Sequence, residues 1–355
     1  MSQTSKGIVQ KCLTFDYPER IPREMWLLPW AQSKYPEAVE EINRRFPSDF
    51  GGVEWYYKPS TVAKGNPYIK GTSTDDWGCE FINLQDGIIG EVREPMITDI
   101  ADWKNVKPPY AQLPSGSYEI QKFYDDVKRL YAKSDKFIKA NICPRPWERY
   151  QFLRGTQDSL MDVLMPDYGF KDLLQKIHDF YIREVELWAK ADVDAIMFMD
   201  DWGSQNQLLI PPEMWREFFK PVYKEYCDAA KAEGKFVFMH SDGYIQDIYA
   251  DLIEIGVDAV NSQLFCMDTD YLKETAKGKI TFWGEIDRQW ILPAEDPEEA
   301  RKAVRQVAEK LYDPAGGIIA QFEFGLGANP ACAVAVFEEW EEVQKDYQKN
   351  LPQRR

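Results

Sequence analysis

The chain has 355 residues and a mass of 41.4 kDa, with 44% hydrophobic and 29% charged residues. This composition supports a sizeable core in one large α/β barrel or two smaller domains, and it excludes a compositionally disordered protein. The net charge of −16, from 43 basic and 59 acidic residues, argues against nucleic acid or an anionic membrane surface as the main partner.

The first 115 residues predict irregular structure. A short helix is expected over Thr4–Leu13, and Met25–Leu28 and Val53–Trp55 have strand character. Apolar residues alternate from Asp76 to Met96 around Asp86-Gly87, which predicts a β-hairpin. We therefore expect residues 1–115 to form an N-terminal extension packed on a main body at 116–355, within one structural domain.

From about residue 116, short apolar runs alternate with amphipathic helical stretches. The runs are Phe137–Ile142, Val193–Met199, Phe236–Met239, Val257–Val260, Ile280–Trp283 and Ile318–Phe322. Repeated strand–helix alternation predicts parallel strands with crossover helices. With the strands of the first part, it predicts an α/β fold, a single (β/α)8 TIM barrel. An open doubly wound sheet is the alternative, but no GxGxxG turn follows any of these runs.

The N-terminal sequence lacks the apolar segment of a secretory signal, and no run approaches the roughly 18 apolar residues of a membrane span. The six cysteines form no CxxC pair, which favours reduced thiols and a cytoplasmic location. The expected partner is a small-molecule substrate, with no membrane and no nucleic acid, and a homodimer remains open.

Polar residues follow the apolar runs at the ends where a barrel carries its chemistry. They are Asn141, Cys143, Asp200, Asp201, Ser204, Gln205, His240, Asp242, Asn261, Gln263, Glu285, Asp287, Gln321 and Glu323. Any one of them could simply begin a loop. Six successive strand ends with acids, amides or histidine predict that this ring lines a functional pocket.

His240 is one of two histidines, and Asp242 follows it at a spacing that places both on one side of the barrel mouth. Glu323 or Glu285 would complete a set of one histidine and two carboxylates, which suits zinc or another divalent metal with an open position. The alternative is an imidazole hydrogen-bonded to a carboxylate without metal. Of Asp200 and Asp201, we expect one to face the pocket and the other to cap a turn or helix.

Several motifs resemble the uroporphyrinogen decarboxylase superfamily, and the likeness spans nearly the whole chain. They are Asp200–Gln205, Ile210–Trp215, His240–Gly243, Asp251–Ala259, Arg154-Gly155, Trp283–Asp287, Gly316–Ile319 and Phe46–Asp49. The resemblance implies a (β/α)8 barrel. It also implies one of two chemistries: metal-free decarboxylation of uroporphyrinogen, or methyl transfer to or from a corrinoid protein, usually with zinc.

The departures from the decarboxylase pattern concern anion binding. Arg20–Ala31 lacks the arginine-bearing second half of the decarboxylase segment, although arginine suits the many carboxylates of a porphyrinogen. Gln321–Gly325 lacks the family's C-terminal histidine. Asp49 still matches the decarboxylases' catalytic aspartate.

The thiol-directed methyltransferases carry His-x-Cys and a second cysteine near the last strand, where this chain has His240, Asp242 and Glu323. Oxygen ligands make a metal more Lewis acidic than thiolates do, which favours cleavage of an ether or alcohol by methyl transfer to a corrinoid. The resemblance thus predicts a zinc-dependent methyltransferase that moves a methyl group between a methoxy or methylated substrate and a corrinoid protein, with His240, Asp242 and Glu323 as metal ligands.

In this hypothesis, the catalytic residues are Asp201, Asp49 and Glu285, and the substrate-binding residues are Trp202, Gln205, Gln263 and Trp283. The two tryptophans could equally belong to the core. Two alternatives remain: a decarboxylase without cofactor that uses Asp49, and a barrel without catalytic activity that binds a ligand or a corrinoid protein.

Overall fold

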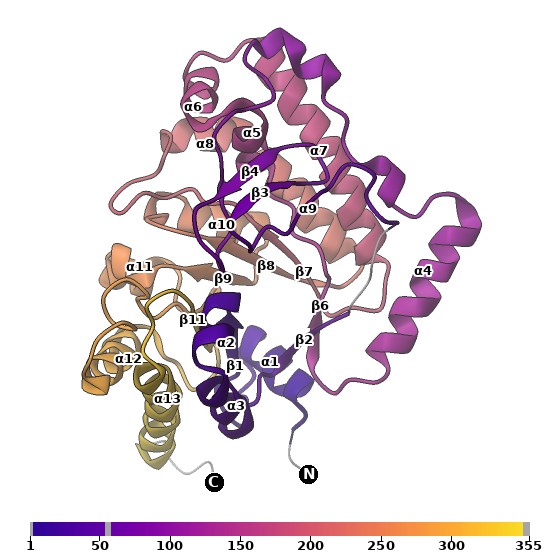
Figure 1. Cartoon of the computed structure of the whole chain (residues 1–355). Helices are drawn as coiled ribbons and strands as arrows, with labels where there is room; N and C mark the ends of the chain where they lie inside the picture. The colour runs from indigo at the N-terminus through magenta and orange to yellow at the C-terminus, as the bar shows by residue number, and fades with distance from the viewer. Residues whose placement is uncertain (1–2, 54–57, 351–355) are drawn as a thin grey trace.

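A computed structural model describes residues 3–53 and 58–350, apart from the side chains of residues 348–350. Eight strands form one sheet in the order β1-β11-β10-β9-β8-β7-β6-β2, and the neighbouring strands are parallel. The strands are β1 (Arg23–Leu27), β2 (Phe50–Gly52), β6 (Phe137–Lys139), β7 (Ala195–Met199), β8 (Phe236–Ser241), β9 (Ala259–Ser262), β10 (Thr281–Trp283) and β11 (Ile318–Phe324). The predicted (β/α)8 barrel is therefore confirmed, with helices around the strands (Figure 1).

The barrel closes at a seam between β1 and β2, through a backbone hydrogen bond and the side chain of Asp49. The Asp49 backbone N–H donates to the Arg23 carbonyl at 3.0 Å, and the Arg23 N–H donates to Asp49 Oδ2 at 2.9 Å. The Arg20 guanidinium donates to both oxygens of the same carboxylate, at 2.5 and 2.6 Å. Because Arg23 begins β1 and Asp49 precedes β2, this contact lies at the amino ends of the strands.

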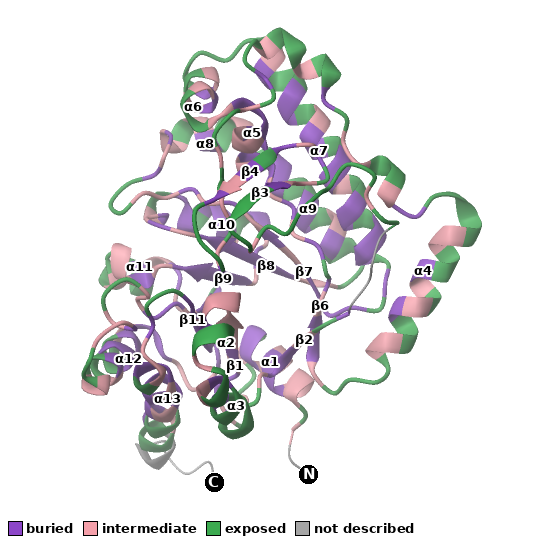
Figure 2. Cartoon of the chain, in the orientation of Figure 1, coloured by how far each residue is buried: buried purple, intermediate pink, exposed green. Residues whose placement is uncertain are grey.

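Most of the helices are amphipathic and cover the outside of the barrel. The helices are α1 (Ser5–Leu13), α2 (Pro29–Lys34), α3 (Pro36–Arg45), α4 (Gly116–Tyr131), α5 (Pro146–Arg154), α6 (Thr156–Leu164), α7 (Tyr168–Ala189), α8 (Pro212–Phe218), α9 (Lys220–Ala232), α10 (Tyr249–Ile255), α11 (Thr269–Thr275), α12 (Pro297–Leu311) and α13 (Pro330–Asn350). Asp167 and Asp296 accept hydrogen bonds from the first turns of α7 and α12, as good N-cap residues do. The faces of the helices that point toward the barrel are buried, and the faces that point outward are exposed (Figure 2).

A small antiparallel sheet is formed by β3 (Gly71–Thr74), β4 (Glu80–Asn83) and β5 (Glu91–Val92). The pairing of β4 with β5 confirms the predicted hairpin around Asp86-Gly87. The predicted strand at Val53–Trp55 is not observed at Val53, since β2 ends at Gly52, and the rest of that prediction lies outside the described residues. Residues 1–115 contribute β1 and β2 to the barrel in addition to this small sheet.

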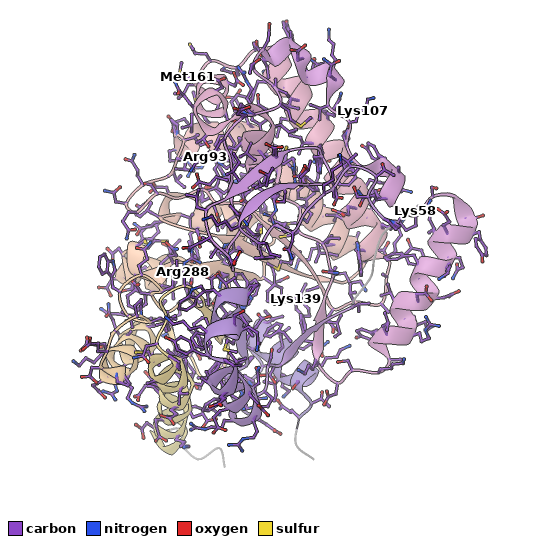
Figure 3. The ribbon with its side chains drawn as sticks, in the orientation of Figure 1. Lys58, Arg93, Lys107, Lys139, Met161 and Arg288 are labelled. Carbon is purple, nitrogen blue, oxygen red and sulfur yellow. The ribbon has the colours of Figure 1, made fainter. Side chains whose placement is uncertain are left out.

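The interior of the barrel is mainly aromatic. Phe50, Phe137, Phe238 and Trp283 pack together, and Val9, Cys12 and Leu13 of α1 belong to the same cluster. A buried ion pair joins Lys139 Nζ to Glu24 Oε1 at 2.8 Å inside this cluster; Lys139 is labelled in Figure 3. The barrel interior is therefore filled, which leaves the mouth at the carboxyl ends as the place for a ligand. In the described part of the chain, every helix is too short or too polar to cross a bilayer.

Candidate metal centre and substrate cavity

Three potential ligands meet where β7 and β8 end. His240 is the next-to-last residue of β8, Asp242 follows that strand, and Asp201 follows the end of β7 by two residues. His240 Nε2 is 3.6 Å from Oδ1 of Asp201 and 3.6 Å from Oδ1 of Asp242, and one donor atom from each residue lies within 4.8 Å of the others. These distances are too long for hydrogen bonds and close to the roughly 3.3 Å between ligands of a tetrahedral zinc with bonds of about 2.0–2.1 Å.

The imidazole is oriented by a buried amide. His240 Nδ1 lies 2.6 Å from Asn261 Oδ1, while the Asn261 amide donates to the Trp283 carbonyl at 2.5 Å and to Gln321 Oε1 at 2.8 Å. Because the Asn261 oxygen can only accept, Nδ1 carries the proton, and the Nε2 lone pair points toward the carboxylates. This is the partner arrangement that fixes the tautomer of metal-binding histidines.

Two glycines allow the loops that carry the carboxylates to touch. A Cβ on Gly243, where φ is +76°, would lie 2.3 Å from the Gly203 carbonyl oxygen. The Gly203 N–H donates to the Asp242 carbonyl at 3.0 Å, and the Asp242 N–H donates to Asp201 Oδ1 at 2.9 Å. Backbone contact therefore sets the spacing of the two aspartates.

Asp200 has a different role from its neighbour. It is fully buried and accepts hydrogen bonds from the Trp147 and Glu148 N–H groups at 2.9 and 2.7 Å and from the Tyr223 hydroxyl at 2.6 Å. It thereby caps the first turn of α5. Burial raises the pKa of Asp200, and Asp201 is the member of the pair that approaches His240.

Several buried carboxylate oxygens near these ligands have no hydrogen-bond partner in the described structure: Glu148 Oε2, Asp242 Oδ1, and both Oε1 and Oε2 of Glu285. Burial raises the pKa of Glu148 to about 7 and that of Glu285 to about 8. Such unpaired oxygens are costly unless a cation or proton satisfies them. Glu148 was not among the sequence-predicted residues.

Arg288 partly neutralises this acidic group and is labelled in Figure 3. Its guanidinium bonds to Asp242 Oδ2 and lies 3.6 Å from Glu285 Oε1 and 3.5 Å from Glu323 Oε2. Arg288 and Arg145 lie among the carboxylates of Glu148, Asp201, Asp242, Glu285 and Glu323 at this end of the barrel. The excess negative charge and the oxygen-rich donors fit a divalent cation held by Asp201, His240 and Asp242, with Glu323 as the nearby further carboxylate.

A cavity of about 860 Å³ opens beside this cluster. Its polar lining includes His240, Asp242, Arg288, Glu323 and Arg145, and its apolar lining includes Trp26, Leu28, Ile88, Ile89, Met199 and Leu326. The Trp26 ring packs against the His240 ring with 5.1 Å between centroids. The volume falls in the range of small-molecule sites, roughly 300–1,000 Å³.

Gln205 and Gln263, expected to bind substrate, line a smaller pocket beside the main cavity with Glu285. The Gln263 side-chain oxygen accepts the Gly243 N–H at 3.2 Å, which supports the loop of Asp242. Among the described residues, Arg288 and Gln289 line both pockets. The two glutamines thus lie in a pocket beside Arg288, next to the main cavity.

The structure does not bring Trp202, Trp283 or Asp49 to the cavity. Trp202 is fully buried against the Trp147 ring at 5.1 Å and donates to the Tyr223 hydroxyl at 2.8 Å. Trp283 fills the barrel interior and donates to Glu24 at 2.9 Å. Asp49 lies at the seam, at the opposite end of the strands, where its carboxylate accepts hydrogen bonds from the Arg20 side chain and the Arg23 N–H. Both tryptophans belong to the core because each finds its hydrogen-bond partner there.

The fold and this site together define a (β/α)8-barrel enzyme with its chemistry at the carboxyl ends of the strands. Residues 73–342 match the family described as uroporphyrinogen decarboxylase (URO-D), and the chain belongs to that family. The predicted superfamily is therefore confirmed. No curated protein matches the chain.

Solved structures with the same fold include a methyltransferase from Methanosarcina mazei, 15% identical, with a TM-score of 0.66 over 96% of this chain and 99% of that one. A B12-independent methionine synthase from Shewanella sp. W3-18-1 is 15% identical, with a TM-score of 0.46 over 64% of this chain and 68% of that one. A putative B12-independent methionine synthase from Listeria monocytogenes is 13% identical, with a TM-score of 0.42 over 94% and 96%.

Proposed function

We propose that this protein is a metal-dependent methyltransferase that moves a methyl group between a methoxy or methylated substrate and a corrinoid carried by a partner protein. The carrying observation is that His240 Nε2 faces Asp201 and Asp242 at the edge of a large cavity, with the Asp242 Oδ1 atom buried and unpaired. A decarboxylation that needs no metal gives no reason for this donor set. Zinc is the metal that the family resemblance favours.

In the proposed reaction, Asp201, His240 and Asp242 hold the cation, and Glu323 is available as a further ligand. A bound zinc would act as a Lewis acid on the oxygen of the leaving group. Asn261 keeps the His240 lone pair directed at the site, and the Gly203–Gly243 contact fixes the aspartates. Trp26 and Leu28 supply an apolar wall that excludes water from the methyl group.

The methyl acceptor is proposed to come from outside the chain. Among the described residues that line the main cavity there is no cysteine or other strong nucleophile. Cys266 lines the smaller pocket. A corrinoid presented at the open mouth could reach a substrate held at His240. Methyl transfer to the corrinoid leaves the substrate oxygen with the electron pair of the broken bond.

Metal analysis of protein purified without chelator tests the proposal. We expect about one zinc per wild-type chain, since three protein ligands define one catalytic site, and loss of metal together with methyl transfer to cob(I)alamin in His240→Ala. His178→Gln is the matched control, because His178 is buried on α7 and bonded to Glu225 at 2.9 Å, away from the cavity. Metal-free wild-type protein that is unaffected by His240→Ala would refute the proposal.

Incubation with uroporphyrinogen separates this proposal from the decarboxylase alternative. The placement of Asp49 at the amino ends of the strands keeps it from the cavity, so we expect no enzymatic release of carbon dioxide. Release at enzymatic rates would favour the decarboxylase. Tight corrinoid-protein binding without methyl exchange would favour the barrel that lacks catalytic activity.

A further inference from the structure

The main cavity has two guanidinium groups in its lining, and they differ in their partners. Arg288 contacts the carboxylates of Asp242, Glu285 and Glu323, which account for its charge. Arg145 precedes α5 and has Glu148 as its nearest carboxylate, with 3.8 Å between Nη1 and Oε2. That separation is beyond hydrogen-bonding distance.

Arg145 therefore keeps donors that face the cavity. The Cys143 thiol lies beside its side chain and is only a weak acceptor. The Arg145 side chain is 29% exposed, and in the described structure its guanidinium has no hydrogen-bonded anion.

The strand order sets the scale of the distance from Arg145 to the metal cluster. Arg145 lies in the loop between β6 and α5, and His240 is the next-to-last residue of β8. Met199, at the end of β7, also lines the cavity. Two strand spacings of about 4.8 Å separate β6 from β8 by roughly 10 Å, which is the scale of the gap that a ligand bound by both residues would span. Apolar side chains, including Ile88 and Ile89 of the hairpin loop, cover the space at this cavity.

We propose that the methylated substrate carries a carboxylate that Arg145 binds, with its methoxy group at His240 and an apolar spacer about as long as a benzene ring between them. The planar fork of arginine matches the two oxygens of a carboxylate. Arg145 would then decide which end of the substrate enters the metal cluster. The inference rests on the proposed function for the methoxy end only, since recognition of the carboxylate needs no methyl transfer.

Binding of 4-methoxybenzoate and its neutral analogue 4-methoxybenzamide to the full-length protein tests this, measured by titration calorimetry. We expect wild-type protein to bind the acid about tenfold or more tightly than the amide. Arg145→Met should abolish this preference and Arg145→Lys should keep part of it. Arg183→Met is the matched control, because Arg183 also lies 3.8 Å from a glutamate three residues later, but on the outside of the barrel.

Equal affinity of wild-type protein for acid and amide, or no binding of either, would overturn the inference, as would an unchanged preference in Arg145→Met. A cationic substrate would appear as weaker binding of the acid than of the amide, which also overturns it. The proposed function fails separately: a preference that depends on Arg145 without metal or methyl transfer would leave the carboxylate site standing and remove the methyltransferase.

Discussion

Replacement of Asn261 by alanine should weaken metal binding without touching a ligand. The change removes the acceptor for His240 Nδ1 and the donors to the Trp283 carbonyl and Gln321 Oε1. Loss of a hydrogen-bond partner behind a metal-binding histidine typically lowers affinity by about 10- to 100-fold, or about 1.4–2.7 kcal/mol. The buried groups left without partners should also lower the free energy of unfolding by about 1–3 kcal/mol.

Competition of each variant with a chromophoric chelator for zinc measures the affinity, and urea unfolding of metal-free protein measures the stability. Asn261→Asp keeps the acceptor oxygen for Nδ1, so we expect it to retain affinity within a few-fold of wild type. The reasoning would be refuted if Asn261→Ala bound zinc as tightly as wild type while its unfolding free energy fell. That result would show that the amide is structural and does not position the imidazole.

Three further results are expected. Gly243→Ala should lower zinc affinity about tenfold or more, because a Cβ there would push the two aspartate loops apart. Gly234 also has a positive φ but has open space around it, so Gly234→Ala should leave zinc affinity unchanged. Chelator competition measures both variants, and equal zinc affinities would contradict the prediction. In metal-free protein, the raised pKa of Glu285, from 4.5 to about 8, contributes stability that is fully present below pH 4.5 and is lost as pH rises through 8. Calorimetric melting should therefore show the Tm of Glu285→Gln rising relative to the Tm of wild type as pH increases across that window. Parallel curves of Tm against pH for the two proteins would refute the prediction. Asp49→Ala should cost about 1.5–3 kcal/mol in urea unfolding with zinc affinity unchanged, and a loss of affinity would place Asp49 in the site.

The fold could be predicted from the sequence largely because the buried strands β7 to β11 contain or adjoin short apolar runs, and amphipathic helices separate these runs. β2 was harder to find, since Phe50–Gly52 is only three residues long and contains two glycines. Helix α5 was missed because it is buried on several sides. Trp147, Tyr150 and Leu153 are buried together with Arg149 and Arg154, so its sequence does not separate a polar face from an apolar face.

The same omission hid part of the site. Arg145 and Glu148 flank the start of α5, in a stretch without apolar periodicity, and only the tertiary contact with the β7 and β8 ends brings them to His240. Strand-end position found Asp201, His240 and Asp242, whose meeting follows from parallel pairing. It could not distinguish Trp202 from a cavity residue, because strand-end position does not reveal that an indole N–H has found a partner such as Tyr223 in the core.

The seam at Asp49 places the two free edges of the sheet opposite the strands that carry the candidate ligands. Among the described residues, β1 and β2 share no ladder, whereas β8 lies in the middle of the strand order and pairs along its length with β7 and β9. Thermal fluctuations that part the sheet should therefore begin at the seam, with early hydrogen exchange there. The donor atoms would keep their spacing while the sheet opens and closes at the seam, on the far side of the barrel.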